Sequence, residues 1–191
     1  LTKGTPLGAV TVTAQGDPVD SWSISPTLPA GLVFDTATGE LSGTPTAVSP
    51  LTTYTVTATN NGGSGTATIT IQVNDVAPSS ITYAPNFLEL NKDTLMTTVT
   101  PTNQGGTVDT WSISPTLPNG LVFDTSTGSI SGTPTDVTAQ ATYTVTGTNT
   151  GGSATAAVTI IVNDAAPTSI VYTPRSFTLT LGSEMQSVEP T

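Results

Sequence analysis

The sequence predicts an all-β protein in which successive segments of the chain each fold into a β-sandwich of short strands. The composition is rich in Thr and includes 18 Gly and 15 Pro, which favour strands and turns over helices. Apolar residues alternate with Thr or Ser in short runs, and we find no stretch of about 10–15 residues with helical periodicity. The third observation is that the chain repeats itself.

The repeat has a period of 89 residues. This offset aligns residues 1–89 with residues 90–178 without a gap, and about 55 of the aligned positions are identical. Trp22 falls on Trp111 and Tyr54 falls on Tyr143, while a third copy begins near the C-terminus. We therefore expect nearly identical building units along the chain.

Two Asn-Asp-x-Ala-Pro motifs mark the boundaries of these units. Each motif follows an apolar run and ends in Pro, which cannot continue the hydrogen-bond ladder of a sheet. We predict a first repeat at residues 1–75 that lacks its first strand, a linker at 76–78, a complete repeat at 79–164, a second linker at 165–167, and the opening strand or strands of a third repeat at 168–191. Linkers this short restrict the angle between neighbouring repeats.

The strands of the complete repeat follow in order. We expect a first strand at 81–83 and 88–90 that bends at Pro85, a second at 96–99 and a third at 111–113. A hairpin at 122–123 and 129–131 encloses Asp-Thr-Ser-Thr-Gly, where Asp124 can cap the turn and Gly128 can adopt a positive φ. Residues 143–146 and 157–162 form the final pair, joined through 149–152. Seven short strands in such a unit are typical of an immunoglobulin-like sandwich.

Several aromatic, Gly and Pro residues are predicted to be architectural. They are Trp22, Trp111, Phe34, Phe123, Tyr54, Tyr143, Gly39, Gly128, Pro78 and Pro167. A Trp on the third strand of such a sandwich is usually a core residue, although exposed Trp rings could also stack on sugars. Tyr83 and Tyr172 are expected to pack at the junctions between repeats.

Charge and composition exclude several classes of function. The chain has 13 acidic and 3 basic residues and a net charge of −10, so we expect it to bind neither nucleic acid nor anionic membranes. It contains no His and no Cys, so the usual general bases, thiol nucleophiles and soft metal ligands are missing and we expect no enzyme. No apolar run is long enough to span a membrane, and no signal peptide is present in this stretch.

A longer motif carries a family resemblance. It reads Leu-Pro-Ala-Gly-Leu-Val-Phe-Asp-Thr-Ala-Thr-Gly-Glu-Leu-Ser-Gly-Thr-Pro-Thr at 28–46 and recurs with few changes at 117–135. Together with Tyr-Thr-Val-Thr-Ala-Thr-Asn-Asn-Gly-Gly at 54–63, it resembles the immunoglobulin-like and dystroglycan-type cadherin-like modules of large bacterial proteins. This resemblance implies tandem β-sandwiches in a secreted or cell-surface protein, without implying a particular ligand.

The resemblance also implies a calcium hypothesis, because cadherin-like modules bind calcium at their junctions through oxygen ligands. The candidate ligands are Asn74, Asp75, Asn163 and Asp164 in the linker motifs, with Asp20 and Asp109 from adjacent loops. Roles in turns and on the surface are the alternative for these residues. A crosslink between a Lys (Lys3 or Lys92) and an Asn of the same repeat is a further alternative. We otherwise expect no cofactor.

Three functions remain open from the sequence. The first is a structural or adhesive repeat module that acts as a stalk or spacer in a long tandem array, with neighbouring repeats as partners. The second is a subunit of an extracellular filament, since residues 168–178 correspond to the strand that the first repeat lacks and could be donated to another copy. The tail also duplicates residues 1–13, which favours the array. The third is a calcium- or carbohydrate-binding adhesin repeat.

Overall fold

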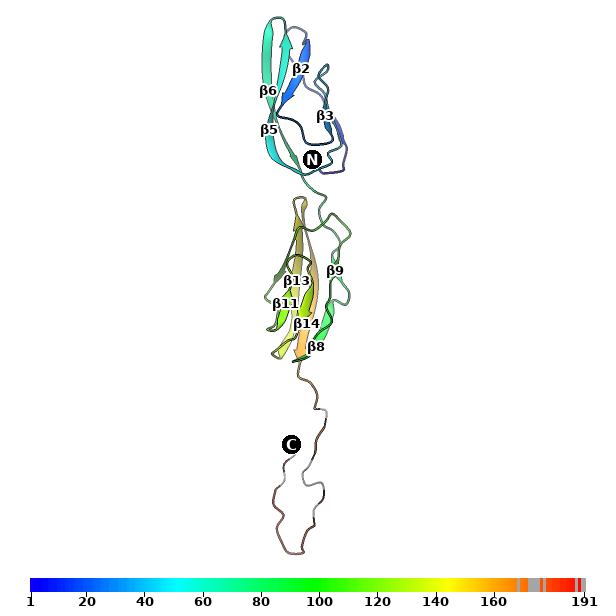
Figure 1. Cartoon of the computed structure of the whole chain (residues 1–191), viewed down its shortest axis with the longest axis vertical. Coiled ribbons are helices and arrows are strands. Elements are labelled where there is room, and N and C mark those ends of the chain that lie inside the picture. Colours follow the sequence, from blue (N-terminus) through cyan, green and yellow to red (C-terminus); the bar gives the residue numbers. More distant parts are fainter. Residues whose placement is uncertain (168, 172–175, 177, 188, 190–191) are drawn as a thin grey trace.

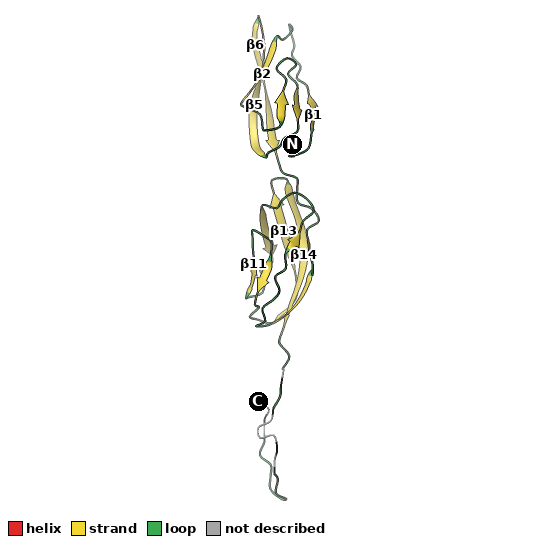
Figure 2. Cartoon of the chain, turned by 45° about the vertical axis from the view of Figure 1, so that its right-hand side comes forward, coloured by secondary structure: helices red, strands yellow, loops and turns green. Residues whose placement is uncertain are grey.

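The protein folds into two elongated β-sandwich units that lie end to end (Figure 1). The computed structural model describes residues 1–167, 169–171, 176, 178–187 and 189. Repeat 1 denotes residues 1–75 and repeat 2 denotes residues 79–164. No helix is found among the described residues, so none of them forms a helix that could cross a membrane (Figure 2).

Repeat 1 contains two three-stranded sheets. Its strands are β1 (Leu7–Val10), β2 (Ser21–Ser25), β3 (Leu32–Phe34), β4 (Leu41–Gly43), β5 (Ser49–Asn60) and β6 (Gly63–Val73). One sheet has the order β1-β4-β3 and the other has the order β2-β5-β6. Side chains from the two sheets meet in a core whose buried members are Leu32, Leu41, Tyr54, Ile71 and Val73.

Repeat 2 repeats this plan and adds an opening segment. Its strands are β7 (Thr82–Tyr83), β8 (Phe87–Asn91), β9 (Pro101–Thr102), β10 (Thr110–Ser114), β11 (Leu121–Phe123), β12 (Ile130–Gly132), β13 (Thr138–Asn149) and β14 (Gly152–Asn163). The main sheet has the order β10-β13-β14-β8, and β8 runs parallel to β14. The opposite layer contains the β11–β12 hairpin and the β7–β9 pair.

The long hairpin of each repeat follows from strict alternation in the sequence. In Thr-Tyr-Thr-Val-Thr the apolar side chains of Tyr143 and Val145 are buried, while Thr142 and Thr144 are on the other face. At the tip, the side-chain oxygen of Asn149 accepts a hydrogen bond from the Gly151 amide at 2.8 Å. Gly152 then adopts a φ of +144°, which a residue with a Cβ rarely does. The turn residues thereby fix the register of the strands.

The predicted first strand is present in repeat 2, but its halves join different layers. β7 pairs antiparallel with β9, and after Pro85 β8 pairs with β14. The second predicted strand, 96–99, is reduced in repeat 2 to a bridge between Val99 and Ile130 and a hydrogen bond from the Met96 amide to Gly132. The counterpart of 96–99 in repeat 1 is β1, whose pairing with β4 is interrupted by a bulge between Leu7 and Val10. The contacts of Met96 and Val99 in repeat 2 are separated in the same way.

Residues 1–75 include no counterpart of β7, and the core they form is smaller than that of repeat 2. The core of repeat 2 has twelve buried members, including Ile81 and Tyr83 of the opening segment, against five in repeat 1. Repeat 1 keeps only the end of this segment, where Thr2 forms a parallel β-bridge with Asn74. The third predicted repeat lies partly outside the described residues, and its described part, between 169 and 189, contains no strand.

Candidate functional site

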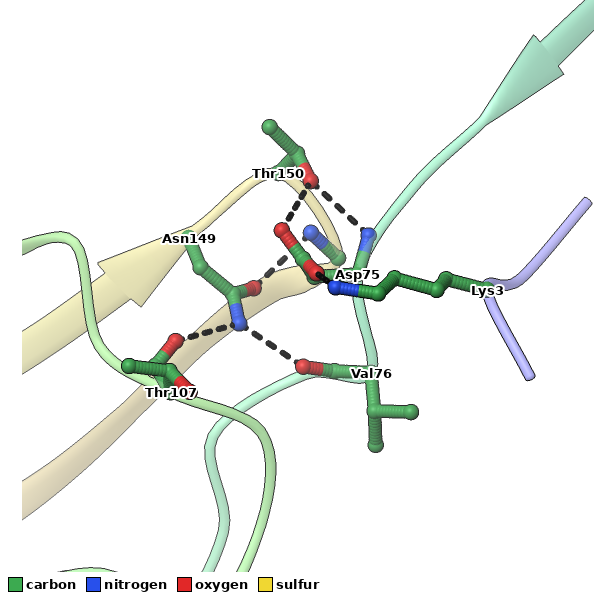
Figure 3. Close-up of polar contacts among 7 residues, drawn as sticks. Lys3, Asp75, Val76, Thr107, Asn149 and Thr150 are labelled. Atoms are coloured by element: carbon green, nitrogen blue, oxygen red, sulfur yellow. Dashed lines mark hydrogen bonds and ion pairs between the residues drawn. The ribbon is translucent and has the colours of Figure 1, made fainter. Parts of the chain in front are cut away.

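The linker between the repeats is held by side chains of repeat 2 (Figure 3). The Asn149 side-chain amide donates hydrogen bonds to the Val76 carbonyl at 2.7 Å and to the Thr107 carbonyl at 2.8 Å. The Thr150 hydroxyl oxygen accepts a hydrogen bond from the Asp75 amide at 2.8 Å and lies 3.2 Å from the Asp75 carboxylate. The linker is therefore fastened to the β13–β14 turn.

Further backbone contacts continue along the linker. The Gly106 amide donates to the Ala77 carbonyl at 3.0 Å, and the Ser79 amide donates to the side-chain oxygen of Asn103 at 3.0 Å. The β13–β14 turn lies so close to the linker that a Cβ at Gly151 would be 2.1 Å from the Asp75 carbonyl oxygen. Pro78 is buried. These contacts leave the linker little conformational freedom.

The calcium candidates make other contacts in the structure. Asp75 pairs with Lys3, with 3.5 Å between the Lys3 nitrogen and the nearer carboxylate oxygen, and Asp164 is exposed at the other end of repeat 2. The backbone amides of Asp20 and Asp109 bond to Thr59 and Thr148. Among the described residues, no group of three or more Asp or Glu side chains lies close enough to hold a metal ion. Calcium binding therefore stays a prediction.

The two lysines and their partner asparagines make ordinary contacts. The Lys3 amide donates to the Asn74 carbonyl and the Lys92 amide to the Asn163 carbonyl, both at 2.8 Å, while the side chain of Lys3 contacts Asp75. The Asn163 side-chain amide donates instead to a Glu89 carboxylate oxygen at 3.1 Å. Each Lys–Asn pair thus holds the opening segment beside the last strand through its backbone.

A groove opens in repeat 1 where β7 lies in repeat 2. It has a volume of about 490 Å³, and its apolar wall includes Val12, Val19, Trp22, Val56, Ala58 and Ala67. A smaller pocket of about 150 Å³ adjoins it and shares Val12, Val56 and Ala67 with it; it also contacts Ile24, Phe34, Gly39, Leu41 and Ile69. We call the two together the repeat-1 groove.

The aromatic residues show the effect of this groove. Trp111, Tyr143 and Tyr54 are buried, and Phe123 and Phe34 pack against the cores of their repeats. Trp22 is only half-buried and lines the groove, because no opening strand covers its ring. Tyr83 lies in the core of repeat 2, where its hydroxyl donates to the Gly128 carbonyl, so the expectation that it packs at the junction is wrong. Tyr172 lies outside the described residues.

The Asp-Thr-x-Thr-Gly turns are built as the sequence predicts. The carboxylate of Asp124 accepts hydrogen bonds from the Ser126 amide at 2.8 Å and the Thr127 amide at 3.3 Å. The Ser126 hydroxyl and these amides stabilise the charged form and lower the pKa of Asp124 to about 2. The amides of Ala37 and Thr38 likewise lower the pKa of Asp35. Gly39 and Gly128 have φ values of +75° and +73°.

Comparison with known proteins identifies the repeats. The family model described as "Putative Ig domain" (He_PIG) matches residues 2–74 and again residues 78–163. The chain belongs to the He_PIG family. The first He_PIG match ends at residue 74 and the second begins at residue 78.

Curated relatives of this He_PIG chain include staphylococcal adhesins. It is 34% identical over 130 residues to a "Serine-rich adhesin for platelets" of Staphylococcus aureus, a match covering 67% of the chain and 6% of that relative. The protein of the same name from strain MRSA252 is 32% identical over 129 residues, which is 67% of the chain and 9% of the relative. The chain thus spans less than a tenth of these relatives.

Solved structures similar to the He_PIG chain are multidomain proteins. Extracellular domains 3–5 of Drosophila OTK align with a TM-score of 0.48 and 21% identity, over 85% of this chain and 58% of that one. Titin domains z1z2, solved in complex with telethonin, align with a TM-score of 0.40 and 17% identity, over 87% of this chain and 92% of that one.

Sequence reasoning missed the residues that hold the junction. It assigned Asn149 and Thr150 only to a turn, whereas both contact the linker. The retention of Asn60, Gly62 and Gly63 at the positions of Asn149, Gly151 and Gly152 was the available signal. These shared residues indicated that both repeats have the same turn. They did not show that the turn of repeat 2 also binds the linker, because that contact depends on the neighbouring repeat.

Proposed function

We propose that this chain is a structural module of a secreted or cell-surface protein, and that it serves as a stalk or spacer. Membership of the He_PIG family and similarity to staphylococcal adhesins support a structural or adhesive role at the cell surface. The absence of His and Cys from the sequence supports a role without catalysis.

The observation that carries the proposal is the junction between the repeats. A spacer transmits length only if consecutive units keep a restricted angle. Asn149 and Thr150 hold the linker by side-chain hydrogen bonds, and Gly151 lies against the Asp75 carbonyl. The two repeats lie end to end, so each added unit extends the reach of the chain (Figure 1).

The test measures how tightly the angle is held. The protein contains no Cys, so spin labels can be attached to single cysteines replacing Ser64, near the tip of the β5–β6 hairpin, and Thr116, in an exposed loop of repeat 2. Electron paramagnetic resonance then gives the distribution of the distance between them. We expect one narrow distribution.

A matched pair of variants sharpens the test. Gly151→Ala places a Cβ against the Asp75 carbonyl and should broaden the distribution severalfold. Gly62→Ala changes the equivalent turn of repeat 1, where the nearest atom is the Asn60 side-chain oxygen at 3.3 Å, and should leave the distribution unchanged. A broad distribution in the unmodified chain would contradict the stalk function.

A further inference from the structure

The repeat-1 groove has the shape of a missing strand, and repeat 2 shows which strand fills it. In repeat 2 the equivalent space is occupied by Ile81 and Tyr83, whose side chains are buried in the core. We propose that the repeat-1 groove is a strand-acceptor site, and that its occupant is the segment 169–174 (Ser-Ile-Val-Tyr-Thr-Pro) of a second copy of the chain. This goes beyond the proposed stalk function and does not rest on it.

Two apolar side chains of the occupant match the two parts of the groove. In repeat 2 the Ile81 side chain packs against Gly147, and the counterpart of Gly147 is Ala58 in the wall of the larger part. The Tyr83 hydroxyl reaches the Gly128 carbonyl, and the counterpart of Gly128 is Gly39 in the smaller pocket. The tail sequence repeats the Ile-x-Tyr-x-Pro pattern of 81–85 at 170–174. Its Ile and Tyr therefore correspond to the larger and smaller parts.

The groove also offers a strand edge for pairing. In repeat 2, Thr82 pairs with Thr102 and Tyr83 pairs with Pro101. The counterparts of Pro101 and Thr102 are Val12 and Thr13, which line the groove and belong to no strand in the described chain. Addition of a strand along such an edge supplies backbone hydrogen bonds while alternate side chains enter pockets. If the donated segment pairs in the register that β7 has with β9, Val171 lies opposite Thr13.

Residues 1–191 hold two Ile-x-Tyr-x-Pro segments, of which 81–85 belongs to repeat 2 itself, so the proposal assigns the groove to 170–174 of a second copy. The tail leaves repeat 2 at the end far from repeat 1 (Figure 1), and the equivalent space in repeat 2 is already filled by its own residues 81–83. Exchange between copies would therefore join them head to tail. A net charge of −10 on each copy opposes this association, so added salt should favour it.

A junction between two copies would differ in detail from the junction between repeat 1 and repeat 2 of one chain. Asp17 of repeat 1 stands where repeat 2 has Gly106, and a Cβ on Gly106 would be 1.8 Å from the linker carbonyl of Val76. The exposed loop around Asp17 must therefore shift when a preceding linker approaches. Ala58 likewise adds a methyl group where Gly147 has none, and the flexible end of an Ile side chain must turn aside. The proposal accordingly concerns the strand and its pockets.

Cysteine crosslinking tests the register directly, since the protein has no Cys of its own. The full 191-residue chain carrying both Thr13→Cys and Val171→Cys, oxidised with oxidised glutathione, should give a ladder of dimers and larger species on a non-reducing gel. The matched control keeps Thr13→Cys and moves the second cysteine to Ser187, elsewhere in the same tail. It should give at least tenfold less crosslinked product. Equal yields from both pairs, or no ladder from the first, would overturn the proposal.

Sedimentation velocity tests the association without crosslinks. The unmodified chain should sediment faster as concentration and salt rise. Ile170→Asp should remain a monomer, whereas Leu181→Asp, an equal charge change on a fully exposed tail side chain, should associate like the unmodified chain. Asp17→Gly should associate at several-fold lower concentration. Association that survives Ile170→Asp, or an unmodified chain that stays monomeric throughout, would overturn the assignment, and near-ultraviolet circular dichroism confirms that each variant is folded.

Discussion

The side-chain amide of Asn149 donates a hydrogen bond of 2.7 Å to the Val76 carbonyl, so a turn of repeat 2 holds the chain that enters it. The same amide bonds to Thr107, and its oxygen accepts the Gly151 amide. In repeat 1 the equivalent Asn60 donates to the Pro18 carbonyl at 3.1 Å and accepts from the Gly62 amide. The turn thus forms in both repeats, and in repeat 2 it gains a linker contact.

Replacing Asn149 should weaken both repeat 2 and the junction. Asn149→Ala removes a nearly buried polar group and leaves two carbonyls without these partners, which should lower the free energy of unfolding of repeat 2 by about 1–3 kcal/mol. Urea unfolding followed by Trp111 fluorescence in a Trp22→Phe background measures this. Asn60→Ala is the matched control and should leave the unfolding of repeat 2 unchanged. Equal effects of both variants on repeat 2 would contradict the linker role.

The turn glycine beneath Trp111 should be irreplaceable. Gly128→Ala would place a Cβ 2.7 Å from the Trp111 ring and 2.8 Å from Pro101, at a φ of +73°. The left-handed conformation and the overpacking together should cost repeat 2 about 2–5 kcal/mol in urea unfolding. Gly65→Ala is the control, because a Cβ there meets nothing within 4 Å and repeat 2 already has Ala154 at that position. A Gly128→Ala protein as stable as the control would refute the packing argument.

Repeat 1 should unfold before repeat 2. Its core has five buried members against twelve, and the repeat-1 groove leaves Trp22 half-exposed. Each repeat carries one Trp, so Trp111→Phe reports repeat 1 and Trp22→Phe reports repeat 2. We expect the repeat-1 transition at lower urea concentration. Coincident transitions would show that the junction couples the repeats into one cooperative unit.

Acid should destabilise the Asp-Thr-x-Thr-Gly turns. The folded-state pKa of Asp124 is about 2, below its ordinary value of 3.8, so its stabilising contribution is present above pH 3.8 and is lost as the pH falls towards 2. Asp124→Asn keeps a side-chain hydrogen-bond acceptor that does not titrate. The free energy of unfolding of repeat 2 should therefore fall less steeply in acid in this variant. Carboxyl-carbon NMR titration checks the pKa directly. A titration midpoint at the ordinary value would contradict the hydrogen-bonded turn.

The calcium hypothesis has a simple test. A cation that binds only the folded protein raises the melting midpoint as its concentration exceeds the dissociation constant. The hypothesis predicts a higher midpoint in excess calcium than in EDTA, and predicts that Asp75→Asn removes the difference at the first linker. The Lys3 and Thr150 contacts of Asp75 compete with such a site. Identical midpoints in calcium and EDTA would end the hypothesis.

Local patterns in the sequence predicted the strands and turns well. Alternation of Tyr143 and Val145 with Thr identified β13, and Asp124 with Gly128 identified the turn between β11 and β12, because both signals depend on neighbours within a few residues. The division of the opening segment between two layers at Pro85 was not predicted. It depends on β9 and β14, which lie far along the chain.

The site was less predictable because it depends on contacts between repeats. Asp75 was considered as a calcium ligand, and the sequence does not show that Lys3 and Thr150 approach it. Trp22 and Trp111 occupy identical sequence motifs, yet only Trp111 is buried. The difference arises from a strand some thirty residues earlier in repeat 2 that has no counterpart in repeat 1.

The parallel pairing of β8 with β14 determines how repeat 2 bears tension. Phe87–Asn91 lies beside 159–163 in register, near the end where the chain leaves the repeat (Figure 1). When the two ends of the repeat are pulled apart, β8 is drawn one way and β14 the other, along their shared axis. Their hydrogen bonds are then loaded in shear and must break together, whereas a peeled hairpin would open them one at a time. This geometry resists stretching most strongly along the long axis of the molecule.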